Sequence, residues 1–142
     1  MLRDIPGIIS PDLMKILMEM GHSDFILLAD ANYPAVSGAR RMVRMDAAPA
    51  DELLDAILRF MPLDGFVEKP VTLMSPREDE PAPEIWSEYE RIIKQRDADR
   101  AFSGFRFMER LEFYEFARGA FATVQTGTTA RYANIILQKG VV

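Results

Sequence analysis

The chain has 142 residues and a formal net charge of −5, and this length fits one domain, 1–142, whose core is large enough to fold without a disulfide or a structural metal. Its 17 basic residues are scattered along the chain, which argues against nucleic acid as a partner, and no stretch approaches the ~18 consecutive apolar residues of a membrane span. The chain contains no cysteine and one histidine, which excludes thiol catalysis, zinc–thiolate sites and disulfide frameworks and argues against a site built from several histidines.

The first residues carry none of the features of a secretory signal, so we expect a cytoplasmic location. A helix is predicted to begin at Ser10, because a serine side chain caps free backbone N–H groups, and Pro11 suits the first helical position. Apolar residues then recur at helical spacing as far as Met20. Gly21 is predicted to end this helix, since glycine adopts the left-handed conformation at little cost.

The next stretch is an uninterrupted apolar run at 25–29, which predicts a strand buried on both faces. His22, the single histidine, precedes this strand, and Asp30 follows it, at the start of a loop predicted for residues 32–40. These two polar groups therefore lie either at one rim of a sheet or at its opposite ends, and periodicity does not decide between the two. A lone histidine after a helix is also commonly a capping or surface residue.

The remaining elements alternate between strands and helices. Strand composition occurs at 42–45, 66–74, 105–108, 122–126 and 133–137, and helical spacing occurs at 49–60, 84–96 and 110–119. Pro70 lies inside the second of these strands and predicts an edge position or a bulge. The proline-rich, acidic residues 75–83 predict an exposed loop. This alternation without an internal repeat predicts one α/β domain whose mostly parallel sheet is covered on both faces.

The polar residues around 25–29 suggest proton-transfer chemistry. The chain has neither a phosphate-binding glycine loop nor a G-x-S-x-G elbow. One imidazole with Asp24 and Asp30 is a weak metal-binding pattern, so neither a metal nor a cofactor is expected. An imidazole near carboxylates can donate and accept a proton at neutral pH. Conversion between the ring forms of a reducing sugar needs only this, because the ring oxygen gains a proton while the anomeric hydroxyl loses one.

Two separate stretches carry a recognisable pattern. The first reads Gly21-His22-x-Asp24-x-Ile26-x-x-x-Asp30-Ala31-x-x-Pro34, and the second reads Tyr132-Ala133-Asn134-Ile135-Ile136-Leu137-x-Lys139-Gly140-Val141. Together they resemble the family of L-fucose mutarotase and D-ribose pyranase. The stretch 110–115, Arg-Leu-Glu-Phe-Tyr-Glu, is similar to the fucose branch, although Leu111 replaces its usual aromatic residue. The ribose branch typically carries a histidine in this region, and the chain has no second histidine.

The resemblance implies a role for six residues. His22 is the implied proton donor, which requires its ring to lie within bonding reach of the bound sugar. The residues implied to bind sugar hydroxyls are Asp30, Arg110, Tyr132 and Asn134, with the backbone of Ala133 beside them. Tyr132 either binds a hydroxyl or is the second proton-transfer group, and the sequence does not decide between these two roles.

Each of these side chains also has an ordinary structural interpretation. Asp30 could cap the corner between strand and loop, and Arg110 could pair with Glu109 or Glu112. Tyr132 and Asn134 could be ordinary turn and strand residues. The joint pattern, in contrast to its members taken singly, favours the sugar site.

The resemblance also implies the assembly and the activity. It implies a three-layer α/β/α fold, a homodecamer of two pentamers with active sites near subunit interfaces, and cofactor-free interconversion of the α and β anomers of L-fucose or a closely related monosaccharide. An apolar wall for the methyl group at C5 of L-fucose is expected at Phe113 or Tyr33. The alternatives are a pyranase acting on D-ribose and a non-catalytic sugar-binding or transport-accessory protein.

Overall fold

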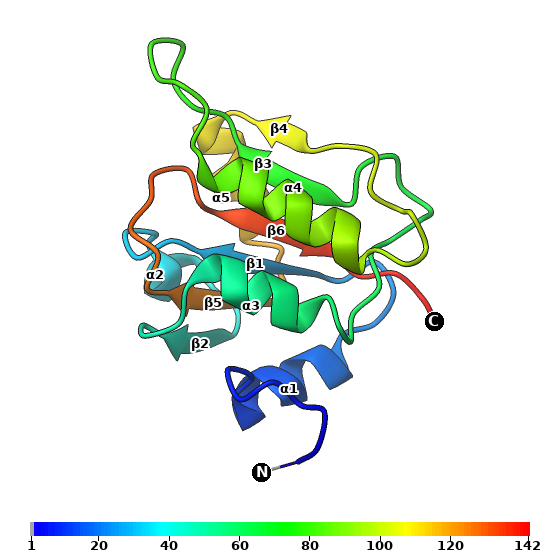
Figure 1. Cartoon of the computed structure of the whole chain (residues 1–142). Helices are drawn as coiled ribbons and strands as arrows, with labels where there is room; N and C mark the ends of the chain where they lie inside the picture. The colour runs from blue at the N-terminus through cyan, green and yellow to red at the C-terminus, as the bar shows by residue number, and fades with distance from the viewer. Residues whose placement is uncertain (1) are drawn as a thin grey trace.

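Five of the six strands in the computed structural model run in one direction, and β6 runs against them (Figure 1). The structure describes residues 2–142. The sheet has the order β2-β5-β1-β6-β3-β4. Its strands are β1 (Phe25–Ala29), β2 (Met42–Met45), β3 (Val71–Met74), β4 (Arg106–Met108), β5 (Ala122–Thr126) and β6 (Ile135–Gln138). The mostly parallel sheet predicted from the sequence is therefore confirmed.

Helices cover both faces of the sheet and make three layers (Figure 1). They are α1 (Pro11–Glu19), α2 (Ala35–Gly38), α3 (Ala50–Ile57), α4 (Ile85–Arg96) and α5 (Arg110–Ala117). The larger core packs α1, α3 and α4 against one face, and the smaller core packs α5 against the other. Because β1 contributes alternate residues to both cores, it is buried on both faces, as its apolar run predicts.

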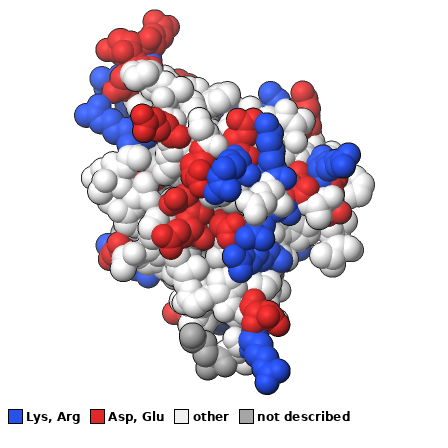
Figure 2. Space-filling model, in the orientation of Figure 1, with Lys and Arg blue, Asp and Glu red and all other residues white. Residues whose placement is uncertain are grey.

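The surface above α3 and α4 mixes the two signs of charge (Figure 2). Asp55 on α3 pairs with Arg59, at 3.0 Å, and with Arg96 at the end of α4, at 2.7 Å. None of the helices formed by residues 2–142 is long and apolar enough to cross a membrane.

The start of α1 agrees with the prediction, and its end does not. Ser10 Oγ accepts a hydrogen bond from the Leu13 N–H at 3.2 Å, as expected of an N-cap. Gly21 does not adopt the predicted left-handed conformation, because the helix already ends at an extended Met20. The left-handed residue is Ser23, with φ 68°. The chain therefore turns toward β1 at Ser23, two residues later than the prediction at Gly21.

Pro70 does not mark an edge strand. The predicted strand 66–74 is confined to β3, which begins at Val71 and lies between β6 and β4 inside the sheet. Pro70 precedes the strand, where it contributes only its carbonyl, which accepts a hydrogen bond from the Gln138 N–H at 2.8 Å. The interpretation of Pro70 as an edge or bulge residue is therefore wrong, because a proline just outside a strand removes no hydrogen bond from the ladder.

The direction of β6 decides which residues can meet. The last residues of the five parallel strands lie at one edge of the sheet, called here the carboxyl edge, and the first residues of β6 lie there too. This edge gathers Asp30 after β1, the loop 75–84 after β3, and Asn134 before β6. The opposite edge, called the amino edge, gathers His22 before β1 and Lys139 after β6.

Candidate active site

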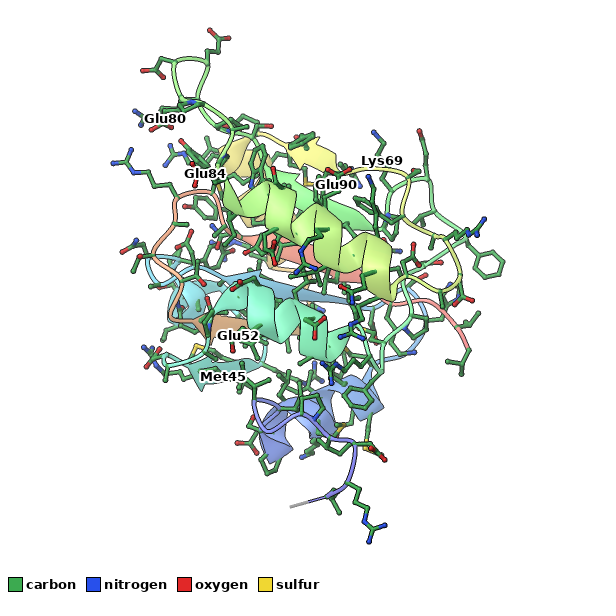
Figure 3. The ribbon with its side chains drawn as sticks, viewed as in Figure 1. Met45, Glu52, Lys69, Glu80, Glu84 and Glu90 are labelled. Carbon is green, nitrogen blue, oxygen red and sulfur yellow. The ribbon has the colours of Figure 1, made fainter. Side chains whose placement is uncertain are left out.

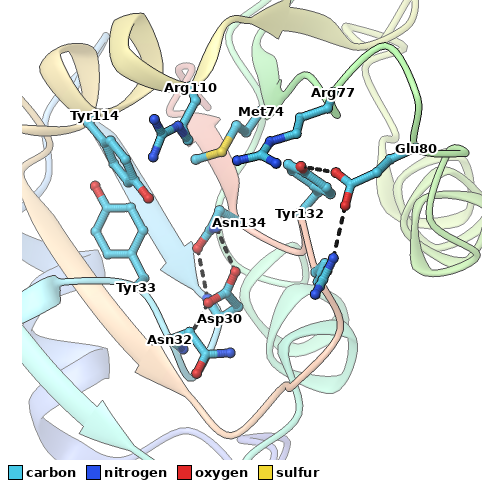
Figure 4. Close-up of a pocket in the computed structure, with 11 residues that line it drawn as sticks. Asp30, Asn32, Tyr33, Met74, Arg77, Glu80, Arg110, Tyr114, Tyr132 and Asn134 are labelled. Carbon is cyan, nitrogen blue, oxygen red and sulfur yellow. Dashed lines mark hydrogen bonds and ion pairs between the residues drawn. The ribbon is translucent and has the colours of Figure 1, made fainter.

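A cavity of about 390 Å³ opens at the carboxyl edge (Figure 4). Its volume lies in the range of small-molecule sites, and this edge is where open α/β sheets bind ligands. Four residues that the resemblance assigns to sugar binding line it: Asp30, Arg110, Tyr132 and Asn134. The sequence did not single out most of the other lining residues, which are Asn32, Tyr33, Met74, Arg77, Glu80, Tyr114 and Arg131.

Asp30 and Asn134 form a rigid polar pair in this cavity (Figure 4). Asn134 Nδ2 donates to Asp30 Oδ2 at 2.7 Å, and Asn134 Oδ1 accepts from the Asp30 N–H at 2.8 Å. The Asn32 N–H donates to Asp30 Oδ1 at 2.9 Å, so Asp30 also caps the corner between strand and loop. Each carboxylate oxygen keeps a further lone pair with which to accept a ligand hydroxyl.

Burial perturbs the acidity of two groups in the cavity. It raises the pKa of Asp30, against the opposing hydrogen bonds from Asn32 and Asn134. It also raises the pKa of Tyr33 to about 12, with a smaller contribution from the neighbouring Tyr114. A carboxylate with a raised pKa is a better proton acceptor, and such perturbed groups gather at functional sites. Tyr33, in contrast, stays a protonated donor.

Two arginine side chains face the cavity and have no hydrogen-bond or ion-pair partner among residues 2–142 (Figure 4). Arg110 forms none of the hydrogen bonds or ion pairs found among residues 2–142, and the alternative pairing with Glu109 or Glu112 does not occur. Glu109 instead caps α5, where its side chain accepts from the Leu111 N–H at 2.8 Å. Arg77 belongs to the loop 75–84, which the sequence marked only as exposed. Both guanidinium groups can donate hydrogen bonds to sugar oxygens.

Tyr132 lines the cavity and has an unusual backbone conformation, whereas its neighbour Ala133 does not line the cavity. Tyr132 has φ 55°, in the left-handed region that residues other than glycine seldom adopt. The Trp86 Nε1–H donates to the Tyr132 carbonyl at 2.9 Å and so holds this segment to α4. Ala133 is fully buried, its carbonyl accepts from the Tyr89 hydroxyl at 2.7 Å, and it does not line the cavity.

His22 lies at the amino edge, away from this cavity. β1 separates it from Asp30, and five strand residues span about 17 Å. The expectation that the ring reaches the bound sugar is therefore not met by the cavity of its own chain. The role of His22 as proton donor stays a prediction. Among residues 2–142 there is also no group of three or more His, Asp or Glu side chains placed to hold a metal ion.

The His22 ring is held by a carboxylate that the sequence did not reveal. Its Nε2 lies 3.2 Å from Oδ1 of Asp64, whose side chain is fully buried, whereas the His22 side chain is 43 % exposed. Burial acts to raise the pKa of Asp64, but hydrogen bonds from the Phe66 N–H, His22 and Ser23 outweigh it and hold the pKa below its usual value. Asp64 is therefore an anion at neutral pH that orients the imidazole, as in nucleophile–base–orienter sites.

The backbone at Gly140 places Asp64 beneath His22. A Cβ atom at Gly140 would overlap the Leu63 carbonyl, and the Asp64 N–H donates to the Gln138 carbonyl at 3.0 Å. We expect Gly140→Ala to lower the free energy of unfolding by about 1–3 kcal/mol, because the backbone must move to admit the methyl group. Urea denaturation measures the effect. Gly38→Ala is the control, since no atom lies within 4 Å of a Cβ there; equal losses in both variants would contradict the close approach.

The chain is similar to known proteins along nearly its whole length. The model of the RbsD / FucU transport protein family matches residues 3–142. The fucose mutarotase of Homo sapiens is 42 % identical over 147 residues, which cover 99 % of this chain and 94 % of that protein. The L-fucose mutarotase of Histophilus somni is 40 % identical over 142 residues, 99 % of this chain and 97 % of that protein.

Solved structures show the same similarity. The fucose mutarotase from Streptococcus pneumoniae, in complex with L-fucose, superposes with a TM-score of 0.94 at 47 % identity and 99 % coverage of both chains. RbsD of Bacillus subtilis, complexed with D-ribose, superposes with a TM-score of 0.69 at 24 % identity, with 96 % of this chain and 97 % of that chain covered. The second comparison shows a shared fold alone.

Proposed function

The chain belongs to the RbsD / FucU transport protein family, and on that premise we propose that it is an isomerase that interconverts the α and β anomers of L-fucose. The observation that carries the proposal is the cavity at the carboxyl edge, where the fixed Asp30 carboxylate faces the unpaired Arg110 guanidinium and the Tyr132 phenol. The similarity along the whole chain to fucose mutarotases, one of them solved with L-fucose, supports the choice of sugar.

Mutarotation needs two coordinated proton movements. A donor protonates the ring oxygen while a base removes the proton of the anomeric hydroxyl, so that the bond between C1 and the ring oxygen breaks and an open-chain aldehyde forms. Rotation about the C1–C2 bond then exposes the other carbonyl face to the C5 hydroxyl formed from the ring oxygen. Its attack on C1 gives the second anomer, as the C5 hydroxyl loses its proton and the carbonyl oxygen regains one. The raised pKa of Asp30 suits the base, and Arg110 and Asn134 supply donors and acceptors to fix the hydroxyls.

His22 remains the proposed proton donor, and we place it in the site of a second copy of the chain. Its ring is half-exposed and already oriented by Asp64, so it is ready to act on a sugar outside its own chain. Exposed apolar side chains flank both halves of such a composite site. Phe66 is 78 % exposed beside His22, and Leu111 is 64 % exposed beside Arg110. Burial of both between copies would complete the site.

A homo-oligomer is therefore part of the proposal, with the decamer implied by the family resemblance as its form. Further apolar surface supports association. A groove of about 840 Å³ beside α1 is lined largely by apolar residues, among them Ile5, Met14 and the 79 % exposed Met18. The cytoplasmic location stays a prediction that cell fractionation can check.

Of the two residues expected to contact the C5 methyl group of L-fucose, one lines the cavity. Tyr33 lines the cavity and packs 5.5 Å, ring centre to ring centre, from Tyr114. Phe113, the other candidate, is fully buried in the smaller core and does not line the cavity. Tyr33 is therefore proposed as the apolar contact of the methyl group.

Saturation-transfer NMR on equilibrated sugars tests the activity directly. With the purified protein, saturating the α-anomer signal of L-fucose is expected to reduce the β-anomer signal, because the enzyme carries magnetisation between them. Line broadening without transfer would instead identify a sugar-binding protein. Transfer between the pyranose and furanose signals of D-ribose, with none for L-fucose, would identify a pyranase.

A further inference from the structure

The loop 75–84 after β3 is fastened to the segment that leads into β6. Figure 3 shows Glu80 near the base of this loop, close to the sheet edge. Its carboxylate accepts hydrogen bonds from the Tyr132 hydroxyl and from Arg131 Nη1, the latter at 2.9 Å (Figure 4). The Glu80 N–H also donates to the Arg77 carbonyl at 3.0 Å, which closes a turn in the loop. A carboxylate 52 residues away in the chain thus holds a phenol of the sugar cavity.

Tyr132 is held at three points. Its backbone has the left-handed φ of 55°, its carbonyl is bonded by the indole of Trp86, and its hydroxyl is bonded by Glu80. Backbone of this kind persists where the surroundings over-determine it, and it gathers at ligand sites. The phenol is therefore a fixed part of the cavity wall.

The hydrogen bond to Glu80 decides how Tyr132 can meet a sugar. A tyrosine hydroxyl has one proton to donate and lone pairs with which to accept. Since the Tyr132 hydroxyl already donates its proton to the Glu80 carboxylate, it has only lone pairs to offer a sugar hydroxyl. Resting on the proposed function, we propose that Glu80 is a positioning residue for the anomer exchange, which holds the Tyr132 phenol protonated and turned so that it accepts a hydrogen bond from a sugar hydroxyl.

The charges around the phenol support this assignment. The hydrogen bond to Glu80 raises the pKa of Tyr132 and burial adds to the rise, whereas the backbone N–H and the charge of Arg77 oppose it. Conversely, the bonds from Tyr132 and Arg131 lower the pKa of Glu80, so it is ionised at neutral pH. The charged groups at the cavity around Tyr132 are Glu80 and Arg77 of the loop, Arg131 of its own segment, Arg110 of α5 and Asp30 after β1. With the charge of Glu80 removed, three arginines remain there against one carboxylate, and they favour the phenolate.

Titration of the phenol tests this coupling without any sugar. The ultraviolet absorbance of the phenolate is followed with pH in the full chain and in Tyr132→Phe, and their difference reports Tyr132 alone. In the Glu80→Gln background, the same difference is expected to move to lower pH by about one unit or more. Glu78→Gln removes the same charge from an exposed position of the same loop and is expected to leave the titration in place. An unchanged Tyr132 titration in Glu80→Gln would overturn the proposal.

Exchange kinetics test whether Glu80 acts through Tyr132. Glu80→Gln is expected to raise KM for L-fucose about tenfold with a smaller change in kcat, because the phenol no longer presents its lone pairs in a fixed direction. In the Tyr132→Phe background, Glu80→Gln is expected to have no further effect, since residues that act as one unit are not additive. Fully additive losses would overturn the positioning role. Failure of the wild-type chain to exchange L-fucose anomers would defeat the proposed function, whereas the titration would still decide the coupling of the two side chains.

Discussion

Asp30→Asn is expected to slow the exchange of L-fucose anomers by about 100-fold or more, the usual loss when a general base is removed. The amide is neutral, so it cannot take the proton of the anomeric hydroxyl. It also turns an NH₂ group toward the Asn32 N–H or the Asn134 amide, where the carboxylate oxygens now accept at 2.9 and 2.7 Å. Saturation transfer at a fixed sugar concentration measures the loss.

The pH dependence of stability separates the chemical effect of Asp30→Asn from a structural one. The pKa of Asp30 is raised above its ordinary value of 3.8 in the folded chain, so the folded state holds this proton more tightly. The wild-type free energy of unfolding therefore falls as the pH rises from 3.8 through the folded pKa. Asp30→Asn lacks this decrease in the free energy of unfolding. Its stability relative to the wild type therefore improves as the pH rises, while its anomer exchange stays slow. Asp99→Asn, at an exposed position, is the control. Exchange that recovers with stability would contradict the role as base.

His22→Ala is expected to slow the exchange by about 100-fold or more, because it removes the proposed proton donor. His22→Gln keeps a donor for Asp64 but cannot shuttle a proton, so it is expected to be as slow as the alanine variant. Both variants are expected to bind L-fucose, since His22 does not line the cavity at the carboxyl edge and its substitution leaves the lining residues unchanged. Binding is measured by the line broadening of the sugar signals. Undiminished exchange in either variant would remove His22 from the mechanism.

The layers of the fold could be predicted from the sequence, and the direction of one strand could not. Amphipathic helices alternate with short apolar runs, and this alone indicates a covered, mostly parallel sheet. A run such as 135–138 is buried on nearly its whole length and carries no mark of its direction, because side chains alternate in the same way in both orientations. The antiparallel pairing of β6 follows from its path after β5, which no local pattern records.

Part of the candidate site could be predicted from the positions of polar residues at strand ends. Asp30 and Asn134 flank apolar strands, so their positions at strand ends could be predicted, and the direction of β6 then brings them together. Asp64 and Glu80 were missed because each meets its partner across 42 or 52 residues of chain, in a turn and a loop whose composition indicates only exposure. The distance of His22 from its own cavity was equally hidden, since the length of β1 does not say which edge holds the ligand.

Mixing two inactive variants tests the composite site most directly. In a 1:1 mixture of His22→Ala and Asp30→Asn chains that exchange subunits, about a quarter of the sites would combine an intact cavity from one chain with an intact His22 from another. Anomer exchange is therefore expected to return to about a quarter of the wild-type rate after mixing. A mixture no faster than the separate variants would contradict it, because a site completed within one chain cannot be restored by a second copy.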